Sequence, residues 1–258
     1  MTLSVDDSFE VDGLAGCTVV VTREVRGELA KLLAACGADV AHVPLIGVID
    51  ADAEQQLALT SALGTSPDWV IVTSVAGADR VAAVADLTTT RLAAVGTATA
   101  RRLAEVSGRA VDLVPDRQLA AALVEEFVEF NRSPQRVVIV VADRAADTLA
   151  VGLEAAGHEV TNITGYQTVL RYPDAAGRAV IAGADAVVFA SGSAAQGWAE
   201  ALGAGAADAL PPIVAAIGPT TAARATESGL KITHVAADYS LAGLVRVLTT
   251  AWSVRERA

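Results

Sequence analysis

D-W-V-I-V-T-S, at residues 68–74, and D-A-V-V-F-A-S, at residues 185–191, are the two stretches that decide the fold. Each begins with an aspartate, continues through four or five mostly apolar residues and ends on a serine, after which the apolar residues follow helical spacing. A short, unbroken apolar run predicts a strand that is buried on both faces, and a serine directly after it predicts a helix N-cap. The two stretches therefore predict the same strand-to-helix unit twice.

The sequence around these stretches repeats in the same order. Residues 20–23 correspond to 140–144, residues 94–100 to 216–222, and the pair 118–119 to 240–241. The spacing between equivalent landmarks stays between 117 residues, from Asp68 to Asp185, and 122 residues, from Gly96 to Gly218. Four landmarks at nearly constant spacing indicate an internal duplication.

Short β-branched runs alternate with Ala- and Leu-rich helical patterns along the whole chain. Strands are predicted at 17–22, 39–43, 68–73, 92–95, 110–113, 136–141, 159–163, 185–190, 212–217 and 231–235. Gly37, Gly108, Gly157 and Gly229 each lie between a predicted helix and the next strand, where a residue with positive φ is favoured. This alternation predicts an α/β fold with parallel sheets covered by helices on both faces.

Composition limits the classes of function. The 258 residues suffice for two domains, and 53% of them are apolar while only 4% are aromatic. No apolar run approaches the ~20 residues of a membrane span, and the opening MTLSVDDSFE lacks the basic and apolar regions of a secretory signal. A cytoplasmic location is expected. The net charge of −11 argues against nonspecific binding to nucleic acid or to an anionic membrane.

Motifs for common cofactors and metals are missing. The sequence contains no G-x-G-x-x-G, no P-loop, no G-x-S-x-G and no H-E-x-x-H, so neither a cofactor nor a metal is expected. Cys17 and Cys36 lack metal-ligand spacing and are interpreted as buried thiols. His42, His158 and His234 lie in or beside a strand that follows a helix-ending glycine, which predicts that they lie at the sheet edge opposite the ligand edge.

Hydroxyl-bearing turns follow four predicted strands and begin helices, so they lie at the carboxyl edges of the sheets. Ordinary N-capping explains any single turn. Four such turns in matching positions favour a cleft for an anionic ligand, because helix N-termini present free N–H groups. The candidate ligand contacts in these turns are Thr73, Ser74, Thr99, Ser191, Ser193, Thr220 and Thr221.

Two arginines and one tyrosine complete the candidate site. Arg23 and Arg144 occupy equivalent places just after the first strand of each repeat, where a guanidinium could hold a carboxylate; a surface arginine beside a helix is the alternative. Tyr166 lies in an extended connection at 164–171 that resembles a second connection at 44–50. Tyr166 either packs in the core with its hydroxyl bonded or faces the cleft.

These motifs, in this order, resemble the uroporphyrinogen-III synthase family over about residues 14–250. The resemblance rests on V-x-x-T-R at 19–23, D-x-V-I-x-T-S at 68–74, A-V-G-x-x-T-A at 94–100, G-Y-Q-T at 165–168, F-x-S at 189–191 and A-I-G-P-T-T-A at 216–222. The order and spacing of the motifs carry the resemblance more than any single one does.

The resemblance implies two flavodoxin-like parallel-sheet domains joined by a two-stranded linker. One domain would combine 1–44 with 172–258, the other would span 51–163, and 45–50 with 164–171 would form the linker strands. It also implies a monomeric, monofunctional lyase that needs no cofactor. Such an enzyme cyclises the linear tetrapyrrole hydroxymethylbilane, with inversion of ring D and loss of water, to uroporphyrinogen III in tetrapyrrole and heme biosynthesis.

The resemblance also assigns roles to residues. Tyr166 matches the family tyrosine that assists departure of the hydroxyl as an acid, and the hydroxyl-bearing turn residues match substrate contacts. Because the substrate bears eight carboxylates, the acidic residues of this chain should lie away from the cleft. Two other interpretations stay open: a noncatalytic two-lobe binding or regulatory protein for an anionic metabolite, and a paralogue that has lost activity.

Overall fold

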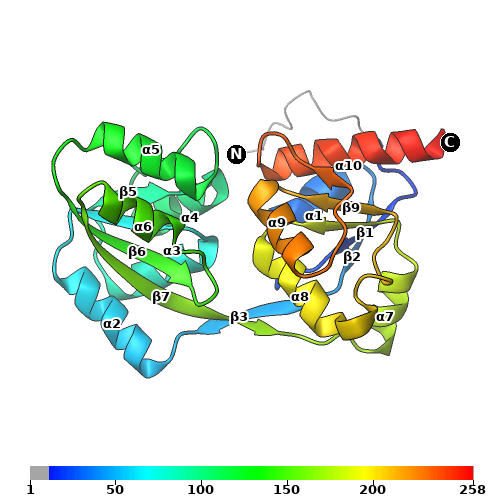
Figure 1. The fold of residues 1–258 in the computed structure, drawn as a ribbon, viewed down its shortest axis with the longest axis horizontal. Coiled ribbons are helices and arrows are strands. Elements are labelled where there is room, and N and C mark those ends of the chain that lie inside the picture. The colour runs from blue at the N-terminus through cyan, green and yellow to red at the C-terminus, as the bar shows by residue number, and fades with distance from the viewer. Residues whose placement is uncertain (1–11, 258) are drawn as a thin grey trace. The chain divides into compact units, whose positions relative to one another are not determined.

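A computed structural model describes residues 12–257 of the chain. The chain folds into two compact units, drawn in Figure 1. Unit 1 runs up to Gly47 and resumes at Val169, whereas unit 2 spans Val48–Thr168. The domain limits drawn from the sequence, 1–44 with 172–258 and 51–163, stay a prediction. What was expected of residues 1–11 lies outside the described residues.

Unit 1 contains a five-stranded sheet in the order β10-β9-β8-β1-β2, and neighbouring strands in it are parallel. Its strands are β1 (Thr18–Val21), β2 (Asp39–His42), β8 (Ala186–Phe189), β9 (Ile213–Ala216) and β10 (His234–Val235). Its helices are α1 (Gly27–Ala35), α7 (Ala175–Ala182), α8 (Gly192–Leu202), η1 (Gly203–Gly205), α9 (Pro219–Glu227) and α10 (Leu241–Glu256).

Unit 2 holds the second sheet, in the order β3-β7-β6-β4-β5. Its strands are β4 (Trp69–Val72), β5 (Arg91–Ala94) and β6 (Arg136–Ala142), together with β3 (Ile46–Asp50) and β7 (Glu159–Leu170), which both cross the unit boundary. Its helices are α2 (Ala53–Gly64), α3 (Val75–Val84), α4 (Thr97–Ser107), α5 (Ala120–Phe130) and α6 (Thr148–Ala155).

The two sheets repeat one arrangement. In unit 1, β9 and β10 lie on one side of β8, and β1 and β2 lie on the other. In unit 2, β5 lies on one side of β4, with an isolated bridge from Ala93 to Leu113 beyond it, and β6 and β7 lie on the other side. The chain therefore begins unit 1 with β1 and β2, which hold the places that β6 and β7, the later strands of the repeat, hold in unit 2. The predicted α/β fold with two flavodoxin-like parallel sheets is confirmed.

Each sheet is covered by helices on both faces, which explains the unbroken apolar runs. Val70 and Val72 of β4 pack in one core cluster with residues of α2, α3 and α4, whereas Trp69 and Ile71 pack in another with residues of α5 and α6. The strand β8 divides in the same way between two clusters of unit 1. Successive side chains of a strand point to opposite faces, so all of them must be apolar here.

The aspartate that begins each repeated stretch joins the starts of two neighbouring strands. Asp68 Oδ2 accepts a hydrogen bond from the Arg136 N–H at 2.8 Å, and Asp185 Oδ2 accepts one from the Thr18 N–H at 3.0 Å. Both aspartates lie at the amino edge of their sheets. This role is structural and belongs to the edge opposite the predicted site.

Three predicted strands differ in the structure. Residues 110–113 form no strand, because the Asp112 carboxylate accepts the Leu92 N–H and leaves a single bridge at Leu113. The strand predicted at 231–235 shortens to His234–Val235. The segment 164–171 is not separate from 159–163, since β7 continues unbroken from Glu159 to Leu170.

Candidate functional site

In unit 2, the strand order reverses between β4 and β6, and the predicted turn residues follow these two strands. Thr73 and Ser74 come directly after β4, and Asp143 and Arg144 come directly after β6. In unit 1, the equivalent place lies between β1 and β8, which precede Arg23 and Ser191 respectively. Ligands of open α/β sheets bind in the crevice at this point, outside the carboxyl ends of the strands. Each unit thus presents a hydroxyl turn and an arginine at the same topological position.

Ser74 is both a helix cap and the partner of Tyr166. Its Oγ accepts the Gly77 N–H at 3.0 Å, which caps the N-terminus of α3. The Tyr166 hydroxyl donates to the same Oγ at 2.8 Å. The two residues are 92 positions apart in sequence. The structure therefore brings together two of the predicted site residues within one unit.

Tyr166 is largely buried, and both its backbone carbonyl and its side-chain hydroxyl form hydrogen bonds. It is only 7% exposed, and its carbonyl accepts the Asp143 N–H at 3.1 Å. The Asp143 carboxylate in turn accepts the Thr168 N–H at 2.8 Å, just past a register shift between Val141 and Ala142. At Gly165, a Cβ would lie 2.5 Å from Val140 Cγ1, so only glycine fits beside that strand. The ring is thus largely buried, and its hydroxyl is bonded to Ser74 at the carboxyl edge of the sheet.

The remaining polar residues of unit 2 divide into exposed and buried ones. Arg144 is exposed, with Nε 3.9 Å from Asp143 Oδ2. Thr97, at the start of α4, is exposed and its N–H donates to Gln118 Oε1 at 3.0 Å. Thr99 is only 6% exposed, in the first turn of α4. In this structure Thr97 offers a ligand more surface than Thr99 does.

In unit 1, the serine turn after β8 forms a compact hydroxyl pair. Ser191 caps α8 by accepting the Ala194 N–H at 3.2 Å, and its Oγ lies 3.1 Å from Ser193 Oγ. The side chain of Arg224 passes over this turn, since a Cβ at Gly192 would lie 2.9 Å from Arg224 Cγ. Arg224 was not among the candidate residues predicted from the sequence. Its only sequence signal is its position four residues after Thr220, on the same helix α9.

The first turn of α9, like that of α4, contains one exposed and one buried threonine. Thr220 is exposed, whereas Thr221 is only 5% exposed inside the first turn of the helix. Gly218 precedes the helix, and a Cβ there would lie 3.1 Å from Tyr239 Cδ1. Thr220 can meet a ligand with its side chain, and Thr221 contributes to packing.

The turn after β1 contains an unexpected polar group. The Thr22 hydroxyl oxygen is fully buried and has no hydrogen-bond partner among residues 12–257. Arg23 beside it is exposed, and its carbonyl lies 2.8 Å from His42 Nε2. His42 was predicted at the opposite edge; this is wrong, because β2 begins at Asp39 and ends at His42. His42 therefore lies at the ligand edge of unit 1.

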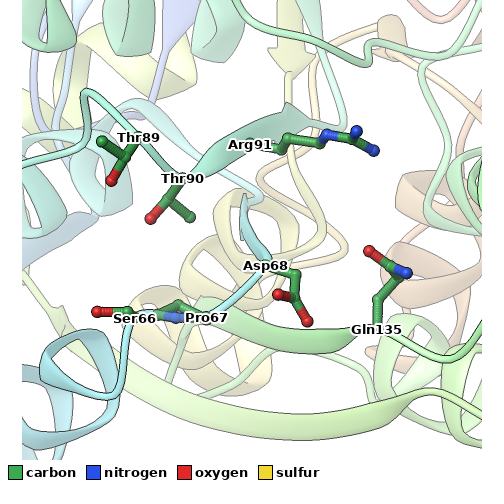
Figure 2. Close-up of a pocket in the computed structure, with 7 residues that line it drawn as sticks. All are labelled: Ser66, Pro67, Asp68, Thr89, Thr90, Arg91 and Gln135. Carbon is green, nitrogen blue, oxygen red and sulfur yellow. The ribbon is translucent and has the colours of Figure 1, made fainter.

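A cavity of about 380 Å³ lies at the other edge of the unit 2 sheet, as Figure 2 shows. It is lined by Ser66, Pro67, Asp68, Thr89, Thr90, Arg91 and Gln135, which precede or begin β4, β5 and β6. The carbonyls of Thr65 and Ser66 and the Asp68 carboxylate all accept hydrogen bonds from the Arg136 guanidinium. The polar groups of this edge thus bond to one another, as expected of a structural edge.

Two pKa shifts of this unit, at Asp68 and His158, lie at the amino edge. Hydrogen bonds from the backbone N–H and then from the guanidinium of Arg136 hold the pKa of Asp68 below its usual value. Burial lowers the pKa of His158, whose Nδ1 accepts the Gln135 N–H at 3.2 Å. Burial likewise raises the pKa of the Cys36 thiol in unit 1. These shifts reflect local structure and fall outside the candidate site.

Neither a metal centre nor a membrane span is found in the part of the chain that the structure describes. Within residues 12–257, no group of three His, Cys, Asp or Glu side chains is arranged to hold a metal ion. No helix over the same residues is long and apolar enough to cross a membrane. The candidate site consists of the hydroxyls, backbone N–H groups, arginines and Tyr166 described above.

Fold and site together define a class: two-unit α/β proteins with hydroxyl turns and arginines at the carboxyl ends of parallel strands. A family model described as uroporphyrinogen-III synthase HemD matches residues 27–246. The chain therefore belongs to the uroporphyrinogen-III synthase family, whose members are cyclising lyases, as the motifs predicted.

Solved structures of that family share the fold. A mutant uroporphyrinogen III synthase from the extremely thermophilic bacterium Thermus thermophilus matches with a TM-score of 0.60 and 18% identity, covering 92% of this chain and 99% of that one. Uroporphyrinogen-III synthetase from Helicobacter pylori matches with a TM-score of 0.55 and 16% identity, with the same coverage of both chains. No curated protein sequence matches the chain significantly.

Proposed function

We propose that this chain converts hydroxymethylbilane to uroporphyrinogen III at the carboxyl-edge turns of its two sheets. The observation that carries the proposal is the pair formed by Tyr166 and Ser74, which puts a phenol hydroxyl beside the N-terminus of α3. The family supports the substrate and the reaction. A substrate with eight carboxylates suits a site built from N–H groups, hydroxyls and arginines.

Tyr166 serves as the general acid. Its hydroxyl proton passes to the terminal hydroxyl of the bilane, the C–O bond breaks and water leaves. The methylene left on ring A bonds to the substituted α-carbon of ring D, which gives a spiro intermediate. The bond from that carbon to its original methylene bridge then breaks, and the freed methylene bonds to the unsubstituted α-carbon of ring D, which inverts ring D and closes the macrocycle. The ring carbon that reacts gives up a proton in the last step, and this proton restores the phenol. One substrate therefore yields one product and one water.

Beyond proton transfer, the protein acts by orienting the substrate. Closure of the bilane without an enzyme gives the unrotated type I isomer, so the protein must fold the chain so that ring D presents the other carbon. Such control of orientation is a large source of acceleration. In unit 2, Thr73 and Arg144 contact substrate carboxylates. In unit 1, Arg23, Ser191, Ser193 and Thr220 offer the same kinds of groups at the equivalent turns, and the buried Thr99 and Thr221 position the helix N-termini of their units.

The proposal also covers the setting of the enzyme. The chain acts as a cytoplasmic monomer without nucleic acid, membrane or cofactor as a partner. The acidic surface, with a net charge of −11, supports the exclusion of nucleic acid and anionic membranes.

One assay tests the proposal. Purified protein is supplied with hydroxymethylbilane, the products are oxidised, and the type I and type III isomers are separated by chromatography. The expected result is mainly type III, while a reaction without protein gives type I. Type I alone in both reactions would reject the enzymatic assignment, and tight binding without turnover would favour the two-lobe binding protein.

A further inference from the structure

Arg80 lies against the candidate acid from a neighbouring helix. It occupies the second turn of α3, six residues after Ser74, and its guanidinium carbon lies 5.6 Å from the centroid of the Tyr166 ring. Arginine over the face of an aromatic ring within about 6 Å is attracted by the electrons of the ring. The contact is therefore a cation–π interaction directed at the one residue proposed to move a proton.

Two further contacts fix the guanidinium of Arg80. Its Nη2 donates to Asp50 Oδ1 of β3 at 3.0 Å, and its Nη1 donates to the Ala76 carbonyl at 3.3 Å. The side chain is only 23% exposed. Three elements, β3, α3 and β7, thus hold Arg80 and the Tyr166 ring in one arrangement, entirely within unit 2.

One atom of Arg80 shows that this arrangement carries a cost. Its Nε is buried and has no hydrogen-bond partner among residues 12–257. A buried donor without a partner is uncommon and destabilises the fold. A purely structural arginine could avoid that cost by extending into solvent, as most arginines do. This cost points to a role of Arg80 at Tyr166.

We propose that Arg80 is a positioning residue for Tyr166, an inference that rests on the function proposed above. The guanidinium fixes the ring so that its hydroxyl stays directed at Ser74 and the substrate. It also stabilises the negative charge that develops on the phenol oxygen when Tyr166 gives its proton to the departing hydroxyl. Both effects act on the chemical step.

Direct binding of a substrate carboxylate by Arg80 is the competing role. The Nη2 of Arg80 is already bonded to a carboxylate, Asp50, whereas Arg144 exposes 39% of its side chain. Carboxylate binding would change KM, and positioning of the acid would change kcat. Kinetics therefore separate the two roles.

The test compares Arg80→Met, Arg80→Lys and a matched control, Arg91→Met. Arg91 also lies over aromatic rings, 5.6 Å from Trp69 and 5.8 Å from Phe130, but at the amino edge of the same sheet. Arg80→Met should lower kcat for type III formation about tenfold, with KM changed less than about twofold. Arg80→Lys, which keeps the charge, should recover part of kcat, and Arg91→Met should leave kcat unchanged.

Three outcomes would overturn the inference. They are an unchanged kcat in Arg80→Met, a rise in KM at constant kcat, and a fall in kcat that is equal in Arg80→Lys and Arg80→Met. Melting curves of all variants verify that each is folded. Wild-type protein assayed alongside separates this inference from the proposed function: if wild type forms no type III isomer, the function fails, whereas an active wild type with unaffected Arg80 variants rejects only the role of Arg80.

Discussion

The two edges of the unit 2 sheet contain the same kinds of residues but use them differently. At the amino edge, Asp68 bonds to Arg136 of a neighbouring strand, and Arg91 covers Trp69. At the carboxyl edge, the Tyr166 hydroxyl bonds to Ser74, and Arg80 lies over the Tyr166 ring. The cavity in Figure 2 lies at the amino edge. The cavity and the proposed site therefore lie at opposite edges of this sheet.

The difference follows from the direction of parallel strands. The helices α1, α3, α4, α6, α8 and α9 each begin after the carboxyl end of a strand of their own sheet, so their free N–H groups collect at that edge. The amino edge receives helix C-termini and the loops that follow them, and its side chains join strand starts to one another. The predictions below test this division, beginning with the largest expected effect.

Tyr166→Phe should lower kcat for type III formation about 100-fold, because a general acid commonly contributes that much or more. The fold should stay intact, since the ring remains and Ser74 still caps α3 through Gly77. Isomer chromatography measures the rate, and a melting curve checks the fold. Tyr172→Phe, which makes the same change at a tyrosine that is 69% exposed, is the control. Equal rates for wild type and Tyr166→Phe would remove Tyr166 from the mechanism.

Ser74→Ala should reduce both stability and rate. Loss of the N-cap should lower the free energy of unfolding by about 1 kcal/mol. Loss of the partner of the Tyr166 hydroxyl should lower kcat about tenfold. Denaturant unfolding and isomer chromatography measure the two quantities.

Asp52→Ala is the matched control for Ser74→Ala. Asp52 caps a different helix, α2, by accepting the Gln55 N–H at 2.8 Å. Its replacement should reduce stability by a similar amount and leave kcat unchanged. If both variants lost kcat equally, the effect of Ser74→Ala would be one of helix stability alone.

Asp68→Asn should affect stability only. The folded pKa of Asp68 is lowered, chiefly by the backbone N–H of Arg136, so its stabilisation is present above pH ~4 and is lost as pH falls through the folded pKa. Because the side chain is 42% exposed, solvent screening limits the effect to about 0.5–1 kcal/mol. The difference in unfolding free energy between variant and wild type should be larger at pH 7 than at pH 3. A loss of kcat in Asp68→Asn would contradict the division between the edges.

The sequence predicted much of the fold because each strand and each turn has a local signal. The runs at 68–74 and 185–191 are apolar throughout because both sheet faces are covered, and their serines cap helices in both units. The strand predicted at 110–113 is absent because backbone pairing with β5 is limited to Asp112 and Leu113, while the Asp112 side chain accepts the Leu92 N–H. Local sequence patterns do not reveal that a side chain will take the place of a backbone hydrogen-bond acceptor.

The site was only partly predictable from sequence. The turn residues were placed at the correct edge by the rule for parallel sheets, but Thr99 and Thr221 are buried, which depends on how each helix is rotated. The Tyr166–Ser74 bond depends on the register of β7 against β6, including the shift at Val141 and Ala142. Arg80 meets Tyr166 only through that same register, so no motif could single it out.

The central claim is that the ligand binds at the carboxyl edge and not at the cavity of the amino edge. The most direct measurement is a titration of isotope-labelled protein with uroporphyrin III, the oxidised product, followed by amide NMR. Binding at the carboxyl edge predicts shifts for the amides of 73–77 and 143–145 in unit 2, with those of 66, 68 and 89–91 unchanged. Shifts confined to 66, 68, 89–91 and 135 would place the ligand in the cavity and contradict binding at the carboxyl edge.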